Sequence, residues 1–161
     1  MQCRNGIIYL ACREKYGKIL SRMRLKEEVL ENMRGDKVSE EIVKDILIFS
    51  WGDDLLKKSA ADRSKYHLVA KMRRCANFVK QMREINPTRY TDMLSCLRTT
   101  AFFDVIEATK RISKYNPDTR TYGAPSTALQ FGTYLKQLTK LAKKILLYRR
   151  TKIPENEMEK C

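Results

Sequence analysis

The chain has 161 residues, of which 43% are hydrophobic and 32% are charged, and 33 Lys and Arg against 19 Asp and Glu give a formal net charge of +14. A chain of this length and composition can bury about two thirds of its unfolded surface, which excludes a disordered tail. No stretch approaches the roughly 18 consecutive apolar residues of a membrane-spanning helix, and the apolar run near the start is too short for a secretory signal. We therefore expect a soluble protein that is nuclear or else cytoplasmic, is not secreted and has no membrane partner.

The cysteines and the single histidine limit the chemistry that the chain can perform. The five cysteines, at positions 3, 12, 75, 96 and 161, are odd in number and irregularly spaced, a pattern typical of reduced thiols. We expect Cys75 and Cys96 to be small core residues and His67 to be partly exposed on a helix. Because the sequence lacks paired zinc ligands, a glycine-rich phosphate loop and a usable nucleophile with a histidine, we expect no metal, no cofactor and no enzymatic activity.

Apolar residues recur at intervals of three and four along most of the chain, which predicts an all-α fold of about five to six helices in a compact bundle. The first predicted helix covers about 15–33 and stops at Gly35. A second begins at Ser39 as its N-cap and breaks around 51–54. We place Trp51 in the core or at its edge, with a stacking platform for a base as the alternative.

Two longer helices, 62–85 and Pro125 to about Arg150, each have one apolar and one basic side. Between them we predict a short helix at 91–97, a longer helix after Thr100 and a loop at 115–124. The predicted apolar positions of the two long helices are Leu68, Val69, Met72, Cys75, Ala76, Phe78, Val79 and Met82, and Ala128, Phe131, Leu135, Leu138, Ala142 and Ile145.

Most of the net charge lies in these two helices. Residues 125–152 contain seven Lys and Arg and no acid, and residues 62–85 contain seven against two acids. Exposed helices usually alternate Lys with Glu, because like charges four residues apart repel one another. A polyanion would relieve that repulsion, so we interpret the chain as a non-enzymatic module that binds the phosphate backbone of DNA. The predicted phosphate contacts are Lys71, Arg73, Arg74, Lys80, Lys136, Lys140, Lys143 and Lys144.

DNA binding by both long helices requires their basic sides to lie together, and other ligands or partners remain as alternatives. We expect the basic sides of the two long helices to form one continuous surface. Four tyrosines near the basic residues could contact phosphates or bases, although a tyrosine at the rim of a core is the commoner case: Tyr66, Tyr122, Tyr134 and Tyr148. The alternatives are RNA in place of double-stranded DNA, and a protein-interaction or homodimerising bundle that binds no nucleic acid.

Four segments, 45–52 (DILIFSWG), 71–78 (KMRRCANF), 103–108 (FDVIEA) and 124–132 (APSTALQFG), resemble in the same order a group of transposon-like animal proteins. Those proteins contain a helical region similar to the core-binding (SAM-like) domain of tyrosine recombinases. The resemblance implies a helical bundle that clamps duplex DNA beside a separate catalytic domain. It also implies a binding part without chemistry, because the recombinase His-x-x-Arg pair is not found at His67.

The resemblance covers about residues 36–150, and it agrees with the domain organisation that we expect from the residues. We predict an N-terminal segment at 1–35, a helical bundle domain at 36–152 and a short acidic tail at 153–161.

Overall fold

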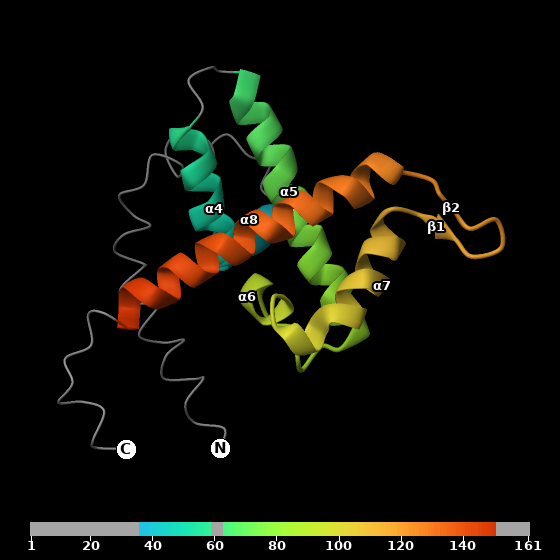
Figure 1. Cartoon of the computed structure of the whole chain (residues 1–161). Coiled ribbons are helices and arrows are strands. Elements are labelled where there is room, and N and C mark those ends of the chain that lie inside the picture. The colour runs from blue at the N-terminus through green and yellow to red at the C-terminus, as the bar shows by residue number, and fades with distance from the viewer. Residues whose placement is uncertain (1–35, 59–62, 151–161) are drawn as a thin grey trace, which may run out of the picture. The chain divides into compact units, whose positions relative to one another are not determined.

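The computed structural model describes residues 36–58 and 63–150, and in these ranges the fold is all-α (Figure 1). The described residues form six α-helices, one short 3-10 helix and one hairpin of two-residue strands. The predicted all-α class is therefore confirmed. The predicted helix at 15–33 and the tail at 153–161 lie outside the described residues. The chain divides into two compact units, residues 1–80 and 81–161, and the predicted single bundle over 36–152 stays a prediction.

The first unit contains α3 (Lys37–Lys44), α4 (Ile46–Lys57) and the first eighteen residues of α5 (Arg63–Ile85). Helices α3 and α4 pack against each other. Asp45 separates them: its backbone N–H closes the last turn of α3, and its buried carboxylate accepts the N–H groups of Leu47 and Ile48, both at 3.0 Å. One residue therefore ends one helix and caps the next.

The structure corrects two predicted boundaries in this unit. The N-cap of α3 is Asp36 and not Ser39, because the Asp36 carboxylate accepts the N–H of Ser39 at 2.9 Å. The break predicted at 51–54 is also wrong: these four residues continue α4, and the chain breaks earlier, at Asp45. Trp51 is only 3% exposed, so it belongs to the core and not to a base-stacking platform.

The core of the first unit contains most of the apolar positions predicted on α5, which are buried except for Val69, which is half-buried. Cys75 is buried with its thiol free, as we expected from its place on the apolar side of α5. The largest fully buried or nearly buried apolar residues of the unit are Ile42, Ile48, Phe49, Trp51, Met72, Phe78 and Val79.

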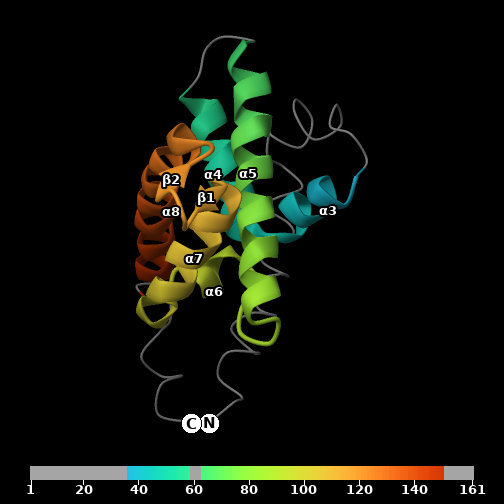
Figure 2. The same ribbon diagram turned by 90° about the vertical axis from the view of Figure 1, so that its right-hand side faces the viewer.

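The second unit contains the end of α5, followed by α6 (Met93–Cys96), a 3-10 helix (Thr99–Ala101), α7 (Phe102–Ile112), a hairpin, and α8 (Pro125–Arg150). These bounds agree closely with the helices predicted from the sequence. Helices α7 and α8 contact each other and lie side by side in Figure 2. Cys96 is buried, as expected, and its thiol donates a hydrogen bond to the Asp92 carbonyl oxygen at 3.2 Å.

The predicted loop at 115–124 contains a β-hairpin, in which β1 (Tyr115–Asn116) pairs antiparallel with β2 (Thr121–Tyr122). The rings of Tyr115 and Tyr122 lie opposite each other, with centroids 4.8 Å apart, and this cross-strand aromatic pair stabilises a hairpin too short to show alternation in the sequence. Figure 1 shows the hairpin joining α7 to α8 and extending beyond both helices.

Polar contacts fix the segment between α5 and α7. Tyr90 is fully buried, and its hydroxyl donates a hydrogen bond to the Asp104 carboxylate on α7. Burial, this bond and the nearby carboxylate charge raise the pKa of Tyr90 to about 12. Arg83 and Arg89 donate to the backbone carbonyls of Thr91 (2.6 Å) and Thr100 (2.7 Å). These arginines stabilise the turn between helices.

Gly132 provides a test of the helical conformation of α8. It is exposed within the helix, and a methyl group at its Cα would meet no atom within 4 Å outside the neighbouring helix backbone. Glycine inside a helix costs about 0.5–1 kcal/mol relative to alanine, because the unfolded chain has more freedom to lose. We expect Gly132→Ala to raise the free energy of unfolding by about that amount in a urea titration. A decrease would show that α8 needs glycine here for a bend or a close contact.

Candidate nucleic-acid interface

The apolar side of α8 fixes the orientation of this helix within the second unit. Phe131 and Leu138 are no more than 1% exposed, and Tyr134 and Ala142 are 6% and 7% exposed. The rings of Phe131 and Tyr134 meet edge to face, with centroids 6.0 Å apart. These positions recur at intervals of three and four, so one side of α8 is buried over about three turns. Of the predicted seam, Phe131, Leu138 and Ala142 are buried, whereas Ala128, Leu135 and Ile145 are half-buried.

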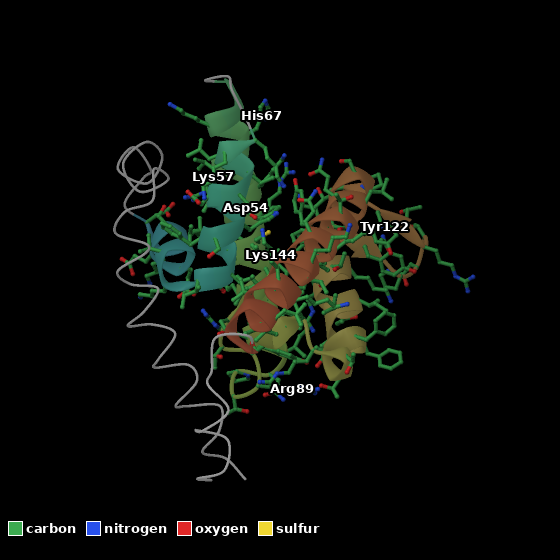
Figure 3. The ribbon with its side chains drawn as sticks, turned by 60° about the vertical axis from the view of Figure 1, so that its left-hand side comes forward. Asp54, Lys57, His67, Arg89, Tyr122 and Lys144 are labelled. Atoms are coloured by element: carbon green, nitrogen blue, oxygen red, sulfur yellow. The ribbon has the colours of Figure 1, made fainter. Side chains whose placement is uncertain are left out.

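The opposite side of α8 presents a row of lysines, which we call the lysine face: Lys136, Lys140, Lys143 and Lys144. All four are exposed, and their spacing places them within about 100° of arc on the helix. From Lys136 to Lys144 the row extends about 12 Å along the helix axis. Figure 3 shows Lys144 on α8.

The lysine face has no neighbouring negative charge on its own helix. Residues 125–152 contain no Asp or Glu, and none of the four lysines forms an ion pair with any other described residue. Three pairs within the row are spaced by three or four residues, and each such like-charge pair costs about 0.2–0.5 kcal/mol. The face is therefore a concentrated positive charge whose internal repulsion no described acid offsets.

The predicted contacts on α5 have different surroundings. Arg74 and Lys80 are exposed and Lys71 is half-buried. These residues belong to the first unit, whereas the lysine face lies wholly in the second. The expectation that both basic sides share one surface stays a prediction, and we argue from the lysine face alone.

Arg73 is already engaged with protein groups, which the sequence did not reveal. Its guanidinium donates to both carboxylate oxygens of Asp36, at 3.0 and 2.5 Å, and to the Ser39 hydroxyl at 3.2 Å. This bidentate geometry is the strongest form of the Arg–carboxylate pair. Asp36 lies 37 residues earlier in the chain, too far for helix periodicity to predict the contact. We therefore leave Arg73 out of the proposed phosphate contacts.

The ion pair between Asp36 and Arg73 shifts the titration of both groups. The hydrogen bond from Arg73 is the largest cause that holds the pKa of Asp36 well below its ordinary value, and the N–H of Ser39 adds to it. The same bond raises the pKa of Arg73. Because the folded-state pKa of Asp36 is lowered, its carboxylate stabilises the fold above the unfolded pKa of about 3.9, and this contribution falls as the pH drops through the folded-state value.

The variant Asp36→Asn tests this interaction, because asparagine can still cap α3 but carries no charge. We expect a lower urea midpoint than that of the wild type at neutral pH, with a difference that narrows steadily as the pH is lowered below about 4. Glu40→Gln, which removes an exposed acid from the same helix, is the control and should change the midpoint little. A difference between wild type and Asp36→Asn that does not vary with pH would contradict the charge-based account.

Other residues that the sequence singled out divide into exposed and buried groups. Tyr66 is exposed on α5. His67 on α5 and Tyr122 on the hairpin are exposed as well, and both are labelled in Figure 3. Tyr134 is buried, and its hydroxyl donates a hydrogen bond to Gln130 Oε1 at 3.3 Å, so it belongs to the core. Burial raises the pKa of the Cys75 thiol well above its ordinary value, so this thiol stays protonated at neutral pH.

One surface was not anticipated from the sequence. Phe102 and Phe103, at the start of α7, are 61% and 81% exposed, and Ile106 one turn later is 38% exposed. The sequence predicts a helix after Thr100 but does not assign its apolar residues to a face. Only the structure, in which Ala108 is the one fully buried residue of α7, shows that they point outward.

Within the part of the chain that the structure describes, no group of three or more His, Cys, Asp or Glu side chains is placed to hold a metal ion. None of the described helices combines the length and the hydropathy needed to span a bilayer.

No protein-family model matches this chain, and comparisons with curated proteins and with solved structures find no significant match.

Proposed function

We propose that the chain binds duplex DNA through the lysine face of α8, without sequence preference and without catalysing a reaction. The observation that carries this proposal is a row of four exposed lysines on a helix segment with no acid. About 12 Å of duplex axis carries about seven phosphate charges on its two strands, so a rigid row of this length can meet several phosphates together. Counterions released from the DNA would supply the affinity.

Two further considerations favour duplex DNA over a single strand. Proteins that bind single strands usually place exposed aromatic rings beside the basic groove, where bases can stack. Phe131 and Tyr134 of α8 are instead buried on the side opposite the lysines. The resemblance of four ordered segments to transposon-like proteins with a recombinase-type binding region also supports a double-stranded target.

The number of phosphate contacts sets the salt dependence of binding. If the four lysines of this face meet phosphates, the slope of log affinity against log salt should be about −3.5 for duplex DNA. The measurement is an electrophoretic or fluorescence titration of the full chain at several salt concentrations, with single-stranded DNA and RNA in parallel. A slope near zero would reject the proposal. If the chain binds RNA more tightly than duplex DNA, then RNA and not duplex DNA is the ligand.

The triple variant Lys140→Gln, Lys143→Gln, Lys144→Gln tests whether this face makes the contacts. It should weaken binding to all duplex sequences alike and bring the slope to about −1, because one of the four phosphate contacts remains. The substituted side chains are exposed and long, so the helix should fold normally.

A matched control removes the same number of charges elsewhere. Lys37, Lys44 and Lys58 are exposed residues of the first unit, and their triple change to Gln lowers the net charge equally. This control should keep a slope near −3.5. Equal losses of affinity in both triple variants would mean that total charge, and not the lysine face, determines binding.

A further inference from the structure

The β-hairpin between α7 and α8 projects from the second unit and carries an arginine at its tip. Figure 1 shows the hairpin extending beyond both helices. Residues 117–120 connect the two strands, and all four are exposed. Arg120 is the one basic residue of this tip. Its side chain forms no ion pair or hydrogen bond with any other residue that the structure describes, so the guanidinium is available to a ligand.

Backbone hydrogen bonds fix the base of the hairpin between α7 and α8. The N–H groups of Gly123 and Ala124 donate to the carbonyl oxygens of Lys114 and Ser113, both at 3.0 Å. Helix α7 ends one residue before Ser113, and α8 begins one residue after Ala124, so these bonds join the ends of the two helices. The hairpin therefore has a defined position relative to α8 and its lysine face, which belong to the same unit.

The turn at the tip is held by its own residues. Asn116 Oδ1 accepts the N–H groups of Asp118 and Thr119, at 2.9 and 3.4 Å. Pro117 restricts the backbone within this turn. Arg120 then adopts a φ of 53°, in the left-handed region that glycine or asparagine adopts at lower cost. An arginine here supplies a cation to the tip but does not favour the turn itself.

The position and chemistry of Arg120 fit the minor groove of duplex DNA. This groove is about 6 Å wide and admits a single extended side chain, whereas a helix or a β-ribbon enters the wider major groove. The strands of this hairpin are only two residues long, too short to follow the major groove. A guanidinium is more weakly hydrated than an ammonium, and the narrow grooves of A·T runs attract it through their enhanced negative potential. The guanine amino group opposes a cation in G·C grooves.

We propose that Arg120 enters the minor groove of the duplex whose phosphates the lysine face contacts, and that it favours A·T runs. This contact rests on the DNA binding proposed for α8. Five residues of extended chain and eleven residues of helix separate Arg120 from Lys136, so their Cα atoms are at most about 34 Å apart, about one turn of duplex. The lysine face contacts phosphates and reads no sequence, so the hairpin adds a preference for groove shape to that binding.

Two duplexes of equal length test this contact in the full chain. In a fluorescence titration the wild type should bind a duplex with a central A-tract about three- to ten-fold more tightly than a G·C-rich duplex. The slope of log affinity against log salt should be about −3.5 on the G·C-rich duplex, from the lysine face alone. On the A-tract it should be about −4.5, because one more cation displaces counterions.

Substitutions at Arg120 separate the guanidinium from the turn. Arg120→Gly suits the left-handed backbone, so it should not lower the thermal midpoint, yet it should bring both duplexes to the same affinity. Arg120→Lys keeps the charge and should retain binding to the G·C-rich duplex while reducing the A-tract preference. Arg98 is exposed in the same unit, and the control Arg98→Gln should keep the full preference.

Asp118 tests the position of the tip from the opposite sign of charge. It is the one acid between Tyr115 and Tyr122, and a carboxylate beside the groove repels the phosphates. Asp118→Asn should strengthen binding to the A-tract duplex several-fold, and the backbone N–H that Asn116 accepts is retained. An unchanged affinity would place the hairpin away from the DNA.

The outcomes distinguish a failure at the hairpin from a failure at the lysine face. Equal affinity of the wild type for both duplexes, or an A-tract preference that survives Arg120→Gly, would exclude Arg120 from the minor groove, while a slope of about −3.5 would still support binding through α8. A preference for the G·C-rich duplex would mean that Arg120 reads guanine in the major groove, and would overturn the proposal. A chain that binds neither duplex would reject both contacts.

Discussion

Burial of the apolar side of α8 is the constraint on which the candidate interface depends. Because Phe131 and Leu138 are buried, the helical period directs Lys136, Lys140 and Lys144 toward the opposite, exposed side of α8. Burying a side chain such as Phe or Leu is worth about 1.5–3 kcal/mol, whereas each like-charge pair in the lysine row costs about 0.2–0.5 kcal/mol. The apolar contacts therefore hold the lysines together against their mutual repulsion. The positive surface is a consequence of packing and does not need a ligand to form.

The two arginine- and lysine-rich helices show why counting charges along a sequence is insufficient. Arg73 on α5 and Lys140 on α8 have the same sign and occupy similar positions opposite an apolar stripe. Arg73, however, lies against the carboxylate of Asp36 and contributes to the structure of α3, whereas Lys140 has no such partner among the described residues. Periodicity places a side chain on a face of its own helix, but it cannot say which other element lies opposite that face.

Sequence reasoning succeeded where one local rule determined the outcome. Helices α5 and α8 were predicted almost to the residue, because Asn86-Pro87 ends the first and Pro125 begins the second. The predicted helix boundaries were wrong where two local rules favoured different positions. Ser39 and Asp36 are both good caps, and the charged carboxylate three residues earlier forms the stronger bond. The glycine and two aspartates at 52–54 suggested a break, but tertiary burial of Trp51 and Asp53 keeps them in α4. The hairpin was missed because strands of two residues have no measurable period.

The exposed face of α7 illustrates a limit of another kind. A sequence reports that a helix is apolar on one side and suggests that this side is buried, yet it does not distinguish burial within the chain from burial against a second molecule. In α7 the small residue Ala108 faces inward, and the large residues Phe102 and Phe103 face outward. The two surfaces therefore differ in chemistry: the lysine face of α8 presents four like charges, whereas the outward side of α7 presents two phenylalanines beside the Glu107–Arg111 ion pair.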